Sequence, residues 1–428
     1  MMTIDDIKVC VVGLGYVGLP LARLASTKYV TVGFDVDPVR VDELGKGHDS
    51  TLEVDDCLLK TAVDSGGLRF TNDPEDIRDC NYYIVTVPTP VDESNHPDLH
   101  PLLSASAIVG QILSAGDVVV YESTVYPGVT EEVCLPEVER RSGLQLNVDF
   151  FGGYSPERIN PGDKEHTVET ICKVTSGSTV EAARLIDDFY RSLLKGGTHP
   201  VSSIRIAEAS KIVENSQRDV NIAFMNELAK IFNAMGIDTG EVLEAAATKW
   251  NFLNFKPGLV GGHCISVDPY YLIERAQVYG VFPRVMYSAR RLNDSMGAYV
   301  AHRLIEQMNL RGIMVRNARI LILGFAFKEN CPDIRNTKVA DIYQTLAPYS
   351  SRIHVADPWV DPRKAFETYN IRIENCVEAC GENSYDAIIL AVPHSAFLDL
   401  PLRELCPSPG IVFDVKSVLP ADYSDLRL

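Results

Sequence analysis

Residues 7–18 read IKVCVVGLGYVG. The apolar, β-branched run over Ile7–Val12 predicts a buried strand, and it leads straight into Gly13-Leu14-Gly15-Tyr16-Val17-Gly18 and a helix. In such a turn the first glycine permits a sharp bend, the second lets a pyrophosphate approach the backbone, and the third lets helix and strand pack closely. The helix N-terminus adds N–H groups and partial positive charge. The stretch therefore predicts a parallel α/β sheet with a dinucleotide at its edge, against the alternative that the glycines only shape a turn.

An acid at the end of the next predicted strand supports the dinucleotide. Asp35 closes the run Val30–Asp35, twenty residues after Gly15. A carboxylate at this place can accept hydrogen bonds from ribose hydroxyls and repels a 2′-phosphate, which favours NAD over NADP. Arg40 follows five residues later, close enough to complicate the choice between NAD and NADP. We therefore predict an NAD site that contains Asp35 and Arg40.

The same alternation of short β-runs and helical stretches occurs at both ends of the chain, which is typical of parallel βαβ units. The predicted strands are Ile7–Val12, Val30–Asp35, Asn81–Val87 and Asp117–Glu122 in the first part, and Arg319–Leu323, Arg352–Ala356, Asp386–Val392 and Ile411–Val415 in the last. Asp37-Pro38 follows the second strand of the first part as Asp357-Pro358 does in the last, and Val87-Pro88 matches Val392-Pro393. This predicts an α/β protein with two doubly wound, Rossmann-like sheets.

The middle of the chain has a different pattern. Apolar residues recur at helical spacing over Ile204–Met235, which contains no Gly or Pro. Further helices are predicted after Asp268-Pro269 and over Arg284–Met308. We expect an NAD-binding domain at 1–200, a helical central domain at 201–308 and a second Rossmann-like domain at 309–428. A helical middle of this kind commonly supports dimerisation, so a homodimer or higher homo-oligomer is expected.

Composition narrows the class of protein. The 428 residues contain 40 Lys and Arg against 58 Asp and Glu, a net charge of −18, which disfavours a nucleic-acid binder. The apolar stretch Val9–Ala22 is too short to span a membrane and follows Asp5 and Asp6 rather than a basic leader, so we expect a cytoplasmic protein without a membrane partner. The ten cysteines include no Cys-x-x-Cys pair, which predicts reduced thiols and no metal site.

A second group of residues has the pattern of covalent catalysis. Cys264 follows two glycines in Gly261-Gly262-His263-Cys264 and precedes Asp268-Pro269, which resembles a helix start. A thiol in this setting can have a lowered pKa and attack a carbonyl, whereas the alternative is an inert buried cysteine. We expect His263 to orient or pack rather than act as a base.

Three polar residues elsewhere are candidates for the same chemistry. Lys211 and Asn215 lie four apart in a predicted helix and share a face, where an ammonium and an amide can stabilise a developing oxyanion. Glu157 lies on a predicted loop after a strand. Without further context, all three would also fit an ordinary solvated surface.

Five motifs occur together in the order typical of one known family: Gly13-Leu14-Gly15-Tyr16-Val17-Gly18-Leu19-Pro20, Ser123-Thr124-Val125, Ser155-Pro156-Glu157, Gly261-Gly262-His263-Cys264 and Phe327-Lys328. From about Ile7 to the C-terminus, the chain resembles the UDP-glucose/GDP-mannose dehydrogenase family. The runs at 249–253, 258–264 and 327–337 resemble the branch of that family that acts on UDP-N-acetylhexosamines.

The resemblance implies a four-electron oxidation of carbon six, from alcohol to acid, with two NAD consumed per sugar. UDP-N-acetylglucosamine is the expected substrate, with UDP-N-acetylgalactosamine and UDP-glucose as alternatives, and the product would serve surface polysaccharide synthesis. Cys264 would capture the aldehyde as a thiohemiacetal, which becomes a thioester and is then hydrolysed. A nucleotide-sugar binding protein without redox activity is the alternative from another class.

The resemblance also assigns individual residues. Lys211 and Asn215 would hold the oxyanion, Asp268 would position or deprotonate water and the substrate hydroxyl, and Glu157 would assist thioester hydrolysis. Thr124 would contact the reacting centre. The remaining expected contacts to NAD are Thr86, Pro88, Ser123 and Thr124, and those to the UDP-sugar are Glu157, Arg158, Lys211, Asn215, Lys256, Gly261, Lys328 and Arg335. For Lys328, Asp333 and Arg335 a surface ion network is the alternative.

The sequence departs from the family pattern at three places. Pro161 stands where UDP-glucose enzymes have a second acid, four residues after Glu157. Ser266-Val267 replaces a Pro-Lys pair after the catalytic cysteine, so Lys256 or Lys249 would supply the missing charge. Thr337 stands where many members have Ser.

Overall fold

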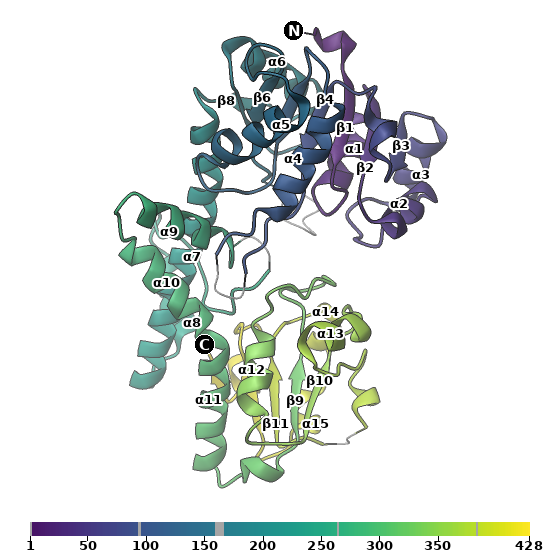
Figure 1. The fold of residues 1–428 in the computed structure, drawn as a ribbon. Coiled ribbons are helices and arrows are strands. Elements are labelled where there is room, and N and C mark those ends of the chain that lie inside the picture. Colours follow the sequence, from purple (N-terminus) through teal and green to yellow (C-terminus); the bar gives the residue numbers. More distant parts are fainter. Residues whose placement is uncertain (1, 93–95, 159–166, 263–264, 382–383) are drawn as a thin grey trace. The chain divides into compact units, whose positions relative to one another are not determined.

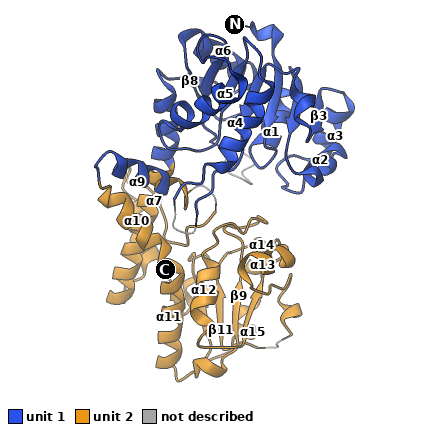
Figure 2. Ribbon diagram, in the orientation of Figure 1, with its two compact units in different colours: residues 1–214, 270–281 blue, residues 215–269, 282–428 orange. Residues whose placement is uncertain are grey.

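The computed structural model describes residues 2–92, 96–158, 167–262, 265–381 and 384–428. The chain divides into two compact units (Figure 2). Unit 1 contains residues 1–214 and 270–281, and unit 2 contains residues 215–269 and 282–428. Each unit is built around one mainly parallel sheet, so the predicted fold class is confirmed.

The sheet of unit 1 has the strand order β3-β2-β1-β4-β5-β6-β7-β8. Its strands are β1 (Lys8–Val12), β2 (Val30–Phe34), β3 (Leu68–Thr71), β4 (Tyr82–Val85), β5 (Val118–Tyr121), β6 (Phe151–Tyr154), β7 (Lys173–Gly177) and β8 (Thr198–Pro200). All neighbours run parallel except β6 and β7. Because β1 lies between β2 and β4, the strand order reverses there, and a ligand is expected at the carboxyl ends of these strands.

Helices cover both faces of this sheet. They are α1 (Gly18–Ala25), α2 (Pro38–Gly45), α3 (Asp56–Asp64), α4 (His100–Ile112), α5 (Leu135–Ser142) and α6 (Val180–Leu193). Alternate strand residues belong to opposite cores: Cys10 and Val12 pack in the cluster of α4 and α5, whereas Val9 and Val11 pack in that of α1 and α6. The sheet is therefore doubly wound, as the continuous apolar runs predict.

The sheet of unit 2 repeats this plan with five parallel strands in the order β10-β9-β11-β12-β13. They are β9 (Ile320–Leu323), β10 (Ile353–Ala356), β11 (Ala387–Leu390), β12 (Ile411–Asp414) and β13 (Leu426–Arg427). The accompanying helices are α11 (Met296–Leu310), α12 (Val339–Leu346), α13 (Pro362–Tyr369), α14 (Ser395–Leu398) and α15 (Leu402–Leu405) (Figure 1).

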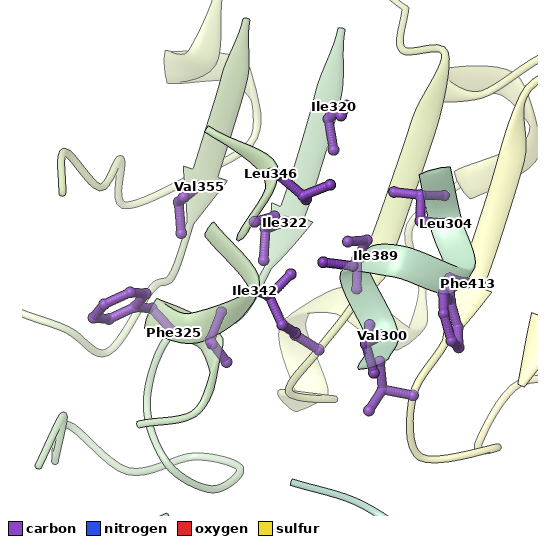
Figure 3. Close-up of a cluster of buried hydrophobic side chains, with 14 of the residues drawn as sticks. Val300, Leu304, Ile320, Ile322, Phe325, Ile342, Leu346, Val355, Ile389 and Phe413 are labelled. Carbon is purple, nitrogen blue, oxygen red and sulfur yellow. The ribbon is translucent and has the colours of Figure 1, made fainter. Parts of the chain in front are cut away.

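The main core of unit 2 lies between this sheet and two of its helices (Figure 3). Val300 and Leu304 of α11, with Ile342 and Leu346 of α12, face a row of strand residues, which are Ile320, Ile322, Ile389 and Phe413. Each fully buried side chain of this kind contributes about 1.5–3 kcal/mol relative to an exposed one. The core therefore fixes the loops at the carboxyl ends of β9, β11 and β12.

The predicted central helices are present, with one correction. The predicted helix over residues 204–235 is confirmed as α7 (Ile204–Met235), which is followed by α8 (Thr239–Ala247), and α9 (Asp268–Val278) begins at Asp268 as expected. The single helix predicted over Arg284–Met308 is wrong. It is interrupted at Ser295 into α10 (Arg284–Asp294) and α11, because α11 turns to pack on the second sheet. The division at residues 200 and 308 stays a prediction.

The internal repeat also needs a correction. Gly13 donates its N–H to the carbonyl of Phe34, the last residue of β2, and Gly324 donates to Ala356, the last residue of β10. Asp357 therefore corresponds to Asp35, not to Asp37 as predicted from the two Asp-Pro pairs. Nowhere in the described parts of the chain is a helix both long and apolar enough to cross a membrane.

Candidate functional site

The glycine turn after β1 has the geometry that the sequence predicts. Gly13 has a φ of +95°, which a side chain rarely adopts. A Cβ on Gly18 would lie 1.8 Å from the carbonyl oxygen of Gly13, so only glycine allows α1 to start there. A Cβ on Gly15 would meet no heavy atom within 4 Å. The turn therefore leaves open space beside its second glycine, at the N-terminus of α1, as a bound pyrophosphate requires.

Asp35 follows β2 directly and is half-buried. One carboxylate oxygen accepts a hydrogen bond from the N–H of Leu14 at 2.8 Å, and the other accepts from Asp37 at 3.0 Å. Each oxygen can accept a further hydrogen bond, so the same carboxylate can hold the turn and receive ribose hydroxyls. These features fit NAD.

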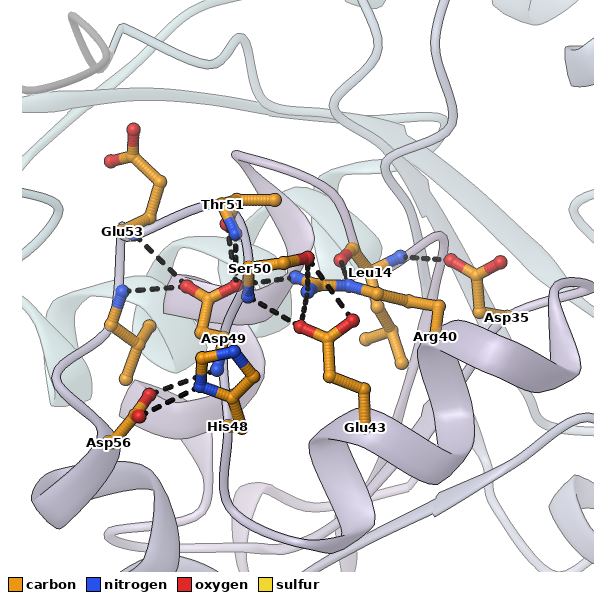
Figure 4. Close-up of polar contacts among 11 residues, drawn as sticks. Leu14, Asp35, Arg40, Glu43, His48, Asp49, Ser50, Thr51, Glu53 and Asp56 are labelled. Carbon is orange, nitrogen blue, oxygen red and sulfur yellow. Dashed lines mark hydrogen bonds and ion pairs between the residues drawn. The ribbon is translucent and has the colours of Figure 1, made fainter. Parts of the chain in front are cut away.

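Arg40, on α2, is buried and faces the protein (Figure 4). Its Nε donates to the carbonyl oxygen of Leu14 at 3.0 Å, and Nη2 donates to Asp49 at 2.8 Å. Nη1 donates to Glu43 at 3.1 Å and to Ser50 at 3.3 Å. All three nitrogens thus bind protein acceptors, and Arg40 braces the glycine turn from behind. Direct contact of Arg40 with the cofactor stays a prediction.

The other residues expected at NAD follow the neighbouring strands. Thr86, just after β4, donates its hydroxyl to the carbonyl of Gly13 at 2.7 Å. Ser123, after β5, donates to the carbonyl of Val87 at 2.6 Å, and Thr124 is half-buried beside it. Pro88 is exposed. These positions share the carboxyl edge of the sheet with the glycine turn, because β1, β4 and β5 are parallel neighbours.

Glu157 is buried on the loop after β6 rather than exposed, with 6% of its surface accessible. One oxygen accepts from the N–H of Arg158 at 2.6 Å, and the other lies 3.5 Å from Nζ of Lys173. Arg158 is exposed and pairs with Glu214 at 2.8 Å. Lys211, on α7, is 5% exposed. Because Glu157 and Lys211 are buried, they are not the ordinary solvated surface residues that the sequence also allowed.

Asn215 and Asp268 are joined in unit 2. The amide Nδ2 of Asn215, on α7, donates to the carboxylate of Asp268, the first residue of α9, and the two residues are 5% and 2% exposed. An amide nitrogen carries two hydrogens, so Asn215 keeps one for another acceptor. Asp268 therefore orients the amide group that we expect to bind an oxyanion.

His263 and Cys264 lie outside the described residues, but the glycines before them do not. The N–H of Gly262 donates to the backbone carbonyl of Arg335 at 3.0 Å, and the carbonyl of Gly262 accepts from the side-chain amide of Asn336 at 3.0 Å. A Cβ on Gly262 would lie 2.9 Å from the ring of Phe327. The segment that leads to Cys264 is therefore packed tightly on the loop after β9.

A small pocket in unit 2 lies beside the same loop. It is lined by Gly261, Phe327, Lys328, Glu329, Lys338 and Lys416, among others. Lys328 and Lys416 give the pocket a positive charge that suits a diphosphate. The ammonium of Lys338 instead pairs with Asp294 at 3.0 Å and with Asp341 at 3.2 Å. The guanidinium of Arg335 lies 2.5 Å from the carboxylate of Asp333, which is buried, and contact of Arg335 with the substrate stays a prediction. Lys256 and Lys249 are exposed.

Sequence reasoning missed three buried or half-buried charged residues. Lys416, two residues after β12, lines the pocket, and burial lowers its pKa. Lys173 and Glu122 form a buried ion pair next to Glu157, with 2.7 Å between Nζ and the carboxylate. The sequence shows each of these residues only as an acid or a lysine at one end of an apolar strand. That pattern does not identify the residue with which it pairs. Across the described ranges, no set of three His, Cys, Asp or Glu side chains could hold a metal.

A glycine turn at the switch point of a doubly wound sheet, with an acid after the next strand, defines a dinucleotide-binding domain of the kind that NAD-dependent dehydrogenases use. A second α/β unit carries a pocket lined by lysines, which suits a phosphorylated ligand. The chain belongs to the UDP-glucose/GDP-mannose dehydrogenase family, as its motifs predict. The family's NAD binding domain matches residues 7–194, its central domain residues 205–295 and its UDP binding domain residues 321–421.

Two similar relatives match nearly the whole length of the chain. A UDP-N-acetyl-D-glucosamine 6-dehydrogenase of Pseudomonas aeruginosa is 55% identical over 99% of this chain and 100% of its own. A protein of the same name from Salmonella typhi is 50% identical over all of both chains. Among solved structures, a UDP-D-ManNAc dehydrogenase of Pyrococcus horikoshii has a TM-score of 0.88 at 30% identity, covering 97% of this chain and 96% of its own.

Proposed function

We propose that this protein is an NAD-dependent UDP-N-acetyl-D-glucosamine 6-dehydrogenase, which oxidises carbon six of the sugar to the acid. The observation that carries the proposal is 55% identity over 99% of the chain to a relative of that name. The NAD turn, the cationic pocket and the buried polar residues agree with such a reaction. We place the reaction in the cytoplasm, where NAD and nucleotide sugars are available, and its product in surface polysaccharide synthesis.

Two oxidations at one carbon explain the need for a thiol. NAD, when bound, accepts a hydride in each oxidation. An aldehyde lacks the alkoxide that drives hydride loss until a nucleophile adds to it. The Cys264 thiolate would add to the aldehyde carbon, and loss of the second hydride would leave a thioester on its sulfur. Water then releases the acid.

The described residues support distinct tasks in these steps. Lys211 and Asn215 would stabilise the oxyanion, with Asn215 oriented by Asp268. Asp268 would also position or deprotonate the substrate hydroxyl and water. Glu157 would accept the proton of the attacking water, and Thr124 would contact the reacting centre.

Substrate binding would use the cationic pocket of unit 2. Lys328 and Lys416 line it and would bind the diphosphate, and Gly261 remains a predicted contact at its wall. Arg158, Lys256 and Arg335 remain predicted contacts. We also propose a homodimer or higher homo-oligomer, because Phe224, Ile231 and Met235 expose apolar side chains at helical spacing on α7.

A stoichiometric assay tests the proposed activity. Purified protein with UDP-N-acetylglucosamine and excess NAD is expected to form two NADH per sugar, measured by absorbance, and one uronic acid, measured by mass spectrometry. A ratio of one NADH would contradict the thioester route. UDP-N-acetylgalactosamine and UDP-glucose serve as parallel substrates, and a higher kcat/KM for either would contradict the proposed substrate.

A further inference from the structure

The ammonium of Lys173 lies between two carboxylates inside unit 1. Lys173 opens β7 and is 3% exposed, and Glu122, directly after β5, is 1% exposed. Nζ of Lys173 lies 2.7 Å from Glu122 and 3.5 Å from Glu157, and it donates to the carbonyl of Pro156 at 3.3 Å. An ammonium has three hydrogens. Two hydrogen bonds and one longer ion pair therefore hold Lys173 in one place, and two of these three contacts are made with the loop that carries Glu157.

Glu122 is itself held from the other side. Its second oxygen accepts a hydrogen bond from the hydroxyl of Tyr190 on α6, and the Tyr190 ring lies 5.2 Å from Nζ of Lys173. Among the described residues, the other titratable neighbours are Tyr82 on β4 and the Arg158–Glu214 pair on the same loop and on α7. Burial raises the pKa of Tyr82 and of Tyr190 well above the usual value, so both stay neutral.

Two carboxylates thus share one buried cation. Burial, opposed by Lys173 and reinforced by Glu157, raises the pKa of Glu122 to about 7. Burial opposes the charge of Lys173, but Glu122 and Glu157 together raise its pKa, so the ammonium persists at neutral pH. The charge that Glu157 experiences consequently depends on Lys173 and on whether Glu122 is ionised.

We propose that Lys173 and Glu122 are positioning residues that set the orientation and charge of Glu157 for thioester hydrolysis. The inference rests on the proposed function. In this step the water oxygen bonds to the thioester carbon while one water proton passes to Glu157. The carbon–sulfur bond then breaks, its electron pair stays on the sulfur of Cys264, and the acid leaves. No oxidation state changes, and Glu157 later returns its proton to the thiolate or to solvent.

The two positioning residues have opposite effects on the base. Without Lys173, Glu157 is left buried beside Glu122 without a counter-ion, which disfavours the charged form that accepts the proton of water. Without the charge of Glu122, Lys173 has only Glu157 to neutralise, which favours that charged form. A purely structural role for the cluster predicts no such opposition.

The test is the pH dependence of thioester hydrolysis. Enzyme is mixed rapidly with UDP-N-acetylglucosamine and NAD and quenched in acid, and the acylated Cys264 peptide is followed by mass spectrometry. In Lys173→Met we expect hydrolysis near pH 7 to fall about tenfold or further, with accumulation of the acyl-enzyme. The acidic limb of the pH–rate profile should move to higher pH by about one unit or more. Lys173→Arg should return this limb to its position in the parent, and Glu122→Gln should move it to lower pH.

Lys195→Met is the matched control, because Lys195 pairs with Glu169 at 2.9 Å but is 78% exposed. It should leave the profile unchanged. Profiles of Lys173→Met and Glu122→Gln that coincide with the parent, or that both move in one direction, would overturn the inference. If Lys173→Met does not fold, Glu122→Gln and Lys173→Arg decide it alone. If the parent itself forms no acyl-enzyme and no acid, the proposed function fails instead.

Discussion

Arg40 donates a hydrogen bond of 3.0 Å from Nε to the carbonyl oxygen of Leu14, the residue between the first two glycines of the nucleotide turn. The N–H of the same Leu14 donates to Asp35. Both polar backbone groups of Leu14 are therefore fixed before any ligand arrives. A turn that is already ordered loses less entropy when it binds a pyrophosphate, which favours affinity.

Arg40→Ala should weaken NAD binding without changing UDP-sugar binding. The change releases the Leu14 carbonyl and leaves Asp49, whose side chain is 0% exposed, without its cation. We expect the Kd for NAD to rise about tenfold and the free energy of unfolding to fall by about 3 kcal/mol, as for a broken buried ion pair. Titration of protein fluorescence and urea unfolding measure the two effects.

Arg78→Ala is the control for that change, because Arg78 pairs with Glu75 at 2.7 Å on the surface. Exposed pairs contribute about 0–1 kcal/mol, so little change is expected. An Arg40 variant that binds NAD as tightly as the parent would show that the brace behind the turn has no role in cofactor binding.

Asp35→Ala should raise the Kd for NAD more than the Kd for UDP-N-acetylglucosamine, because the carboxylate lies at the nucleotide turn of unit 1 and bonds to Leu14. Asp37→Ala is a close control. Asp37 caps α2 by accepting from Val39 at 2.9 Å, so its loss should cost about 1 kcal/mol of stability and leave NAD binding unchanged. Isothermal titration with each ligand separates the cases. Equal losses for both ligands in Asp35→Ala would contradict the ribose contact.

Cys264→Ala should abolish formation of the uronic acid, since no thioester can form. Binding of NAD and of the UDP-sugar should persist, because Gly262 is fixed independently of the thiol, by hydrogen bonds to the carbonyl of Arg335 and from the side-chain amide of Asn336. Mass spectrometry of the products and ligand titration provide the two readouts. Acid formation at the parent rate would exclude the covalent route.

The local parts of this fold could be predicted from the sequence. The Gly13–Gly18 turn, Asp35 and the long helix α7 follow from glycine positions and apolar spacing, which depend on neighbours in the chain. The short strands β3, β7 and β8 were missed, because their sequences lack a long β-branched run, whereas a strand before Glu157 was expected and is β6. Register across the repeat was also misjudged, since Asp37 and Asp357 share a following proline but not a place on the sheet.

The charged cluster beside Glu157 could not be predicted in this way. Lys173 and Glu122 are 51 residues apart in the sequence. They meet because β5, which precedes Glu122, and β7, which begins at Lys173, both lie next to β6 in the sheet. The direction of Arg40 depends likewise on Asp49, a loop residue with no sequence signature. Pairings of this kind depend on strand order and loop path, which local patterns do not encode.

Lys211→Ala should slow the oxidation strongly with little effect on ligand affinity. Loss of one oxyanion donor costs about 2.7–4 kcal/mol of barrier, so kcat should fall about a hundredfold to a thousandfold. Lys230→Ala, on the same helix with its ammonium 5.1 Å from the Tyr299 ring, is the control and should keep a rate near the parent's. Steady-state NADH formation checks both variants. A Lys211 variant within a few-fold of the parent would remove this residue from the mechanism.

Asp357→Ala should lower stability rather than cofactor binding, in contrast to its counterpart Asp35. Asp357 is 0% exposed, and it accepts from the N–H groups of Phe325 and Ala326 and from His394. These contacts hold the pKa of Asp357 below its ordinary value of 3.8, although burial opposes them. The lowered pKa contributes stability that is present above pH 3.8 and is lost as the pH falls through the folded pKa.

Urea unfolding of Asp357→Ala should therefore show a loss of about 2–4 kcal/mol at pH 7, from unsatisfied buried donors. The gap to the parent should narrow below pH 3.8, where the parent carboxylate takes up its proton. Asp399→Ala, at an exposed acid of the same unit, should change little. Loss of NAD affinity without loss of stability in Asp357→Ala would contradict this assignment, because it would make Asp357 a nucleotide ligand like Asp35.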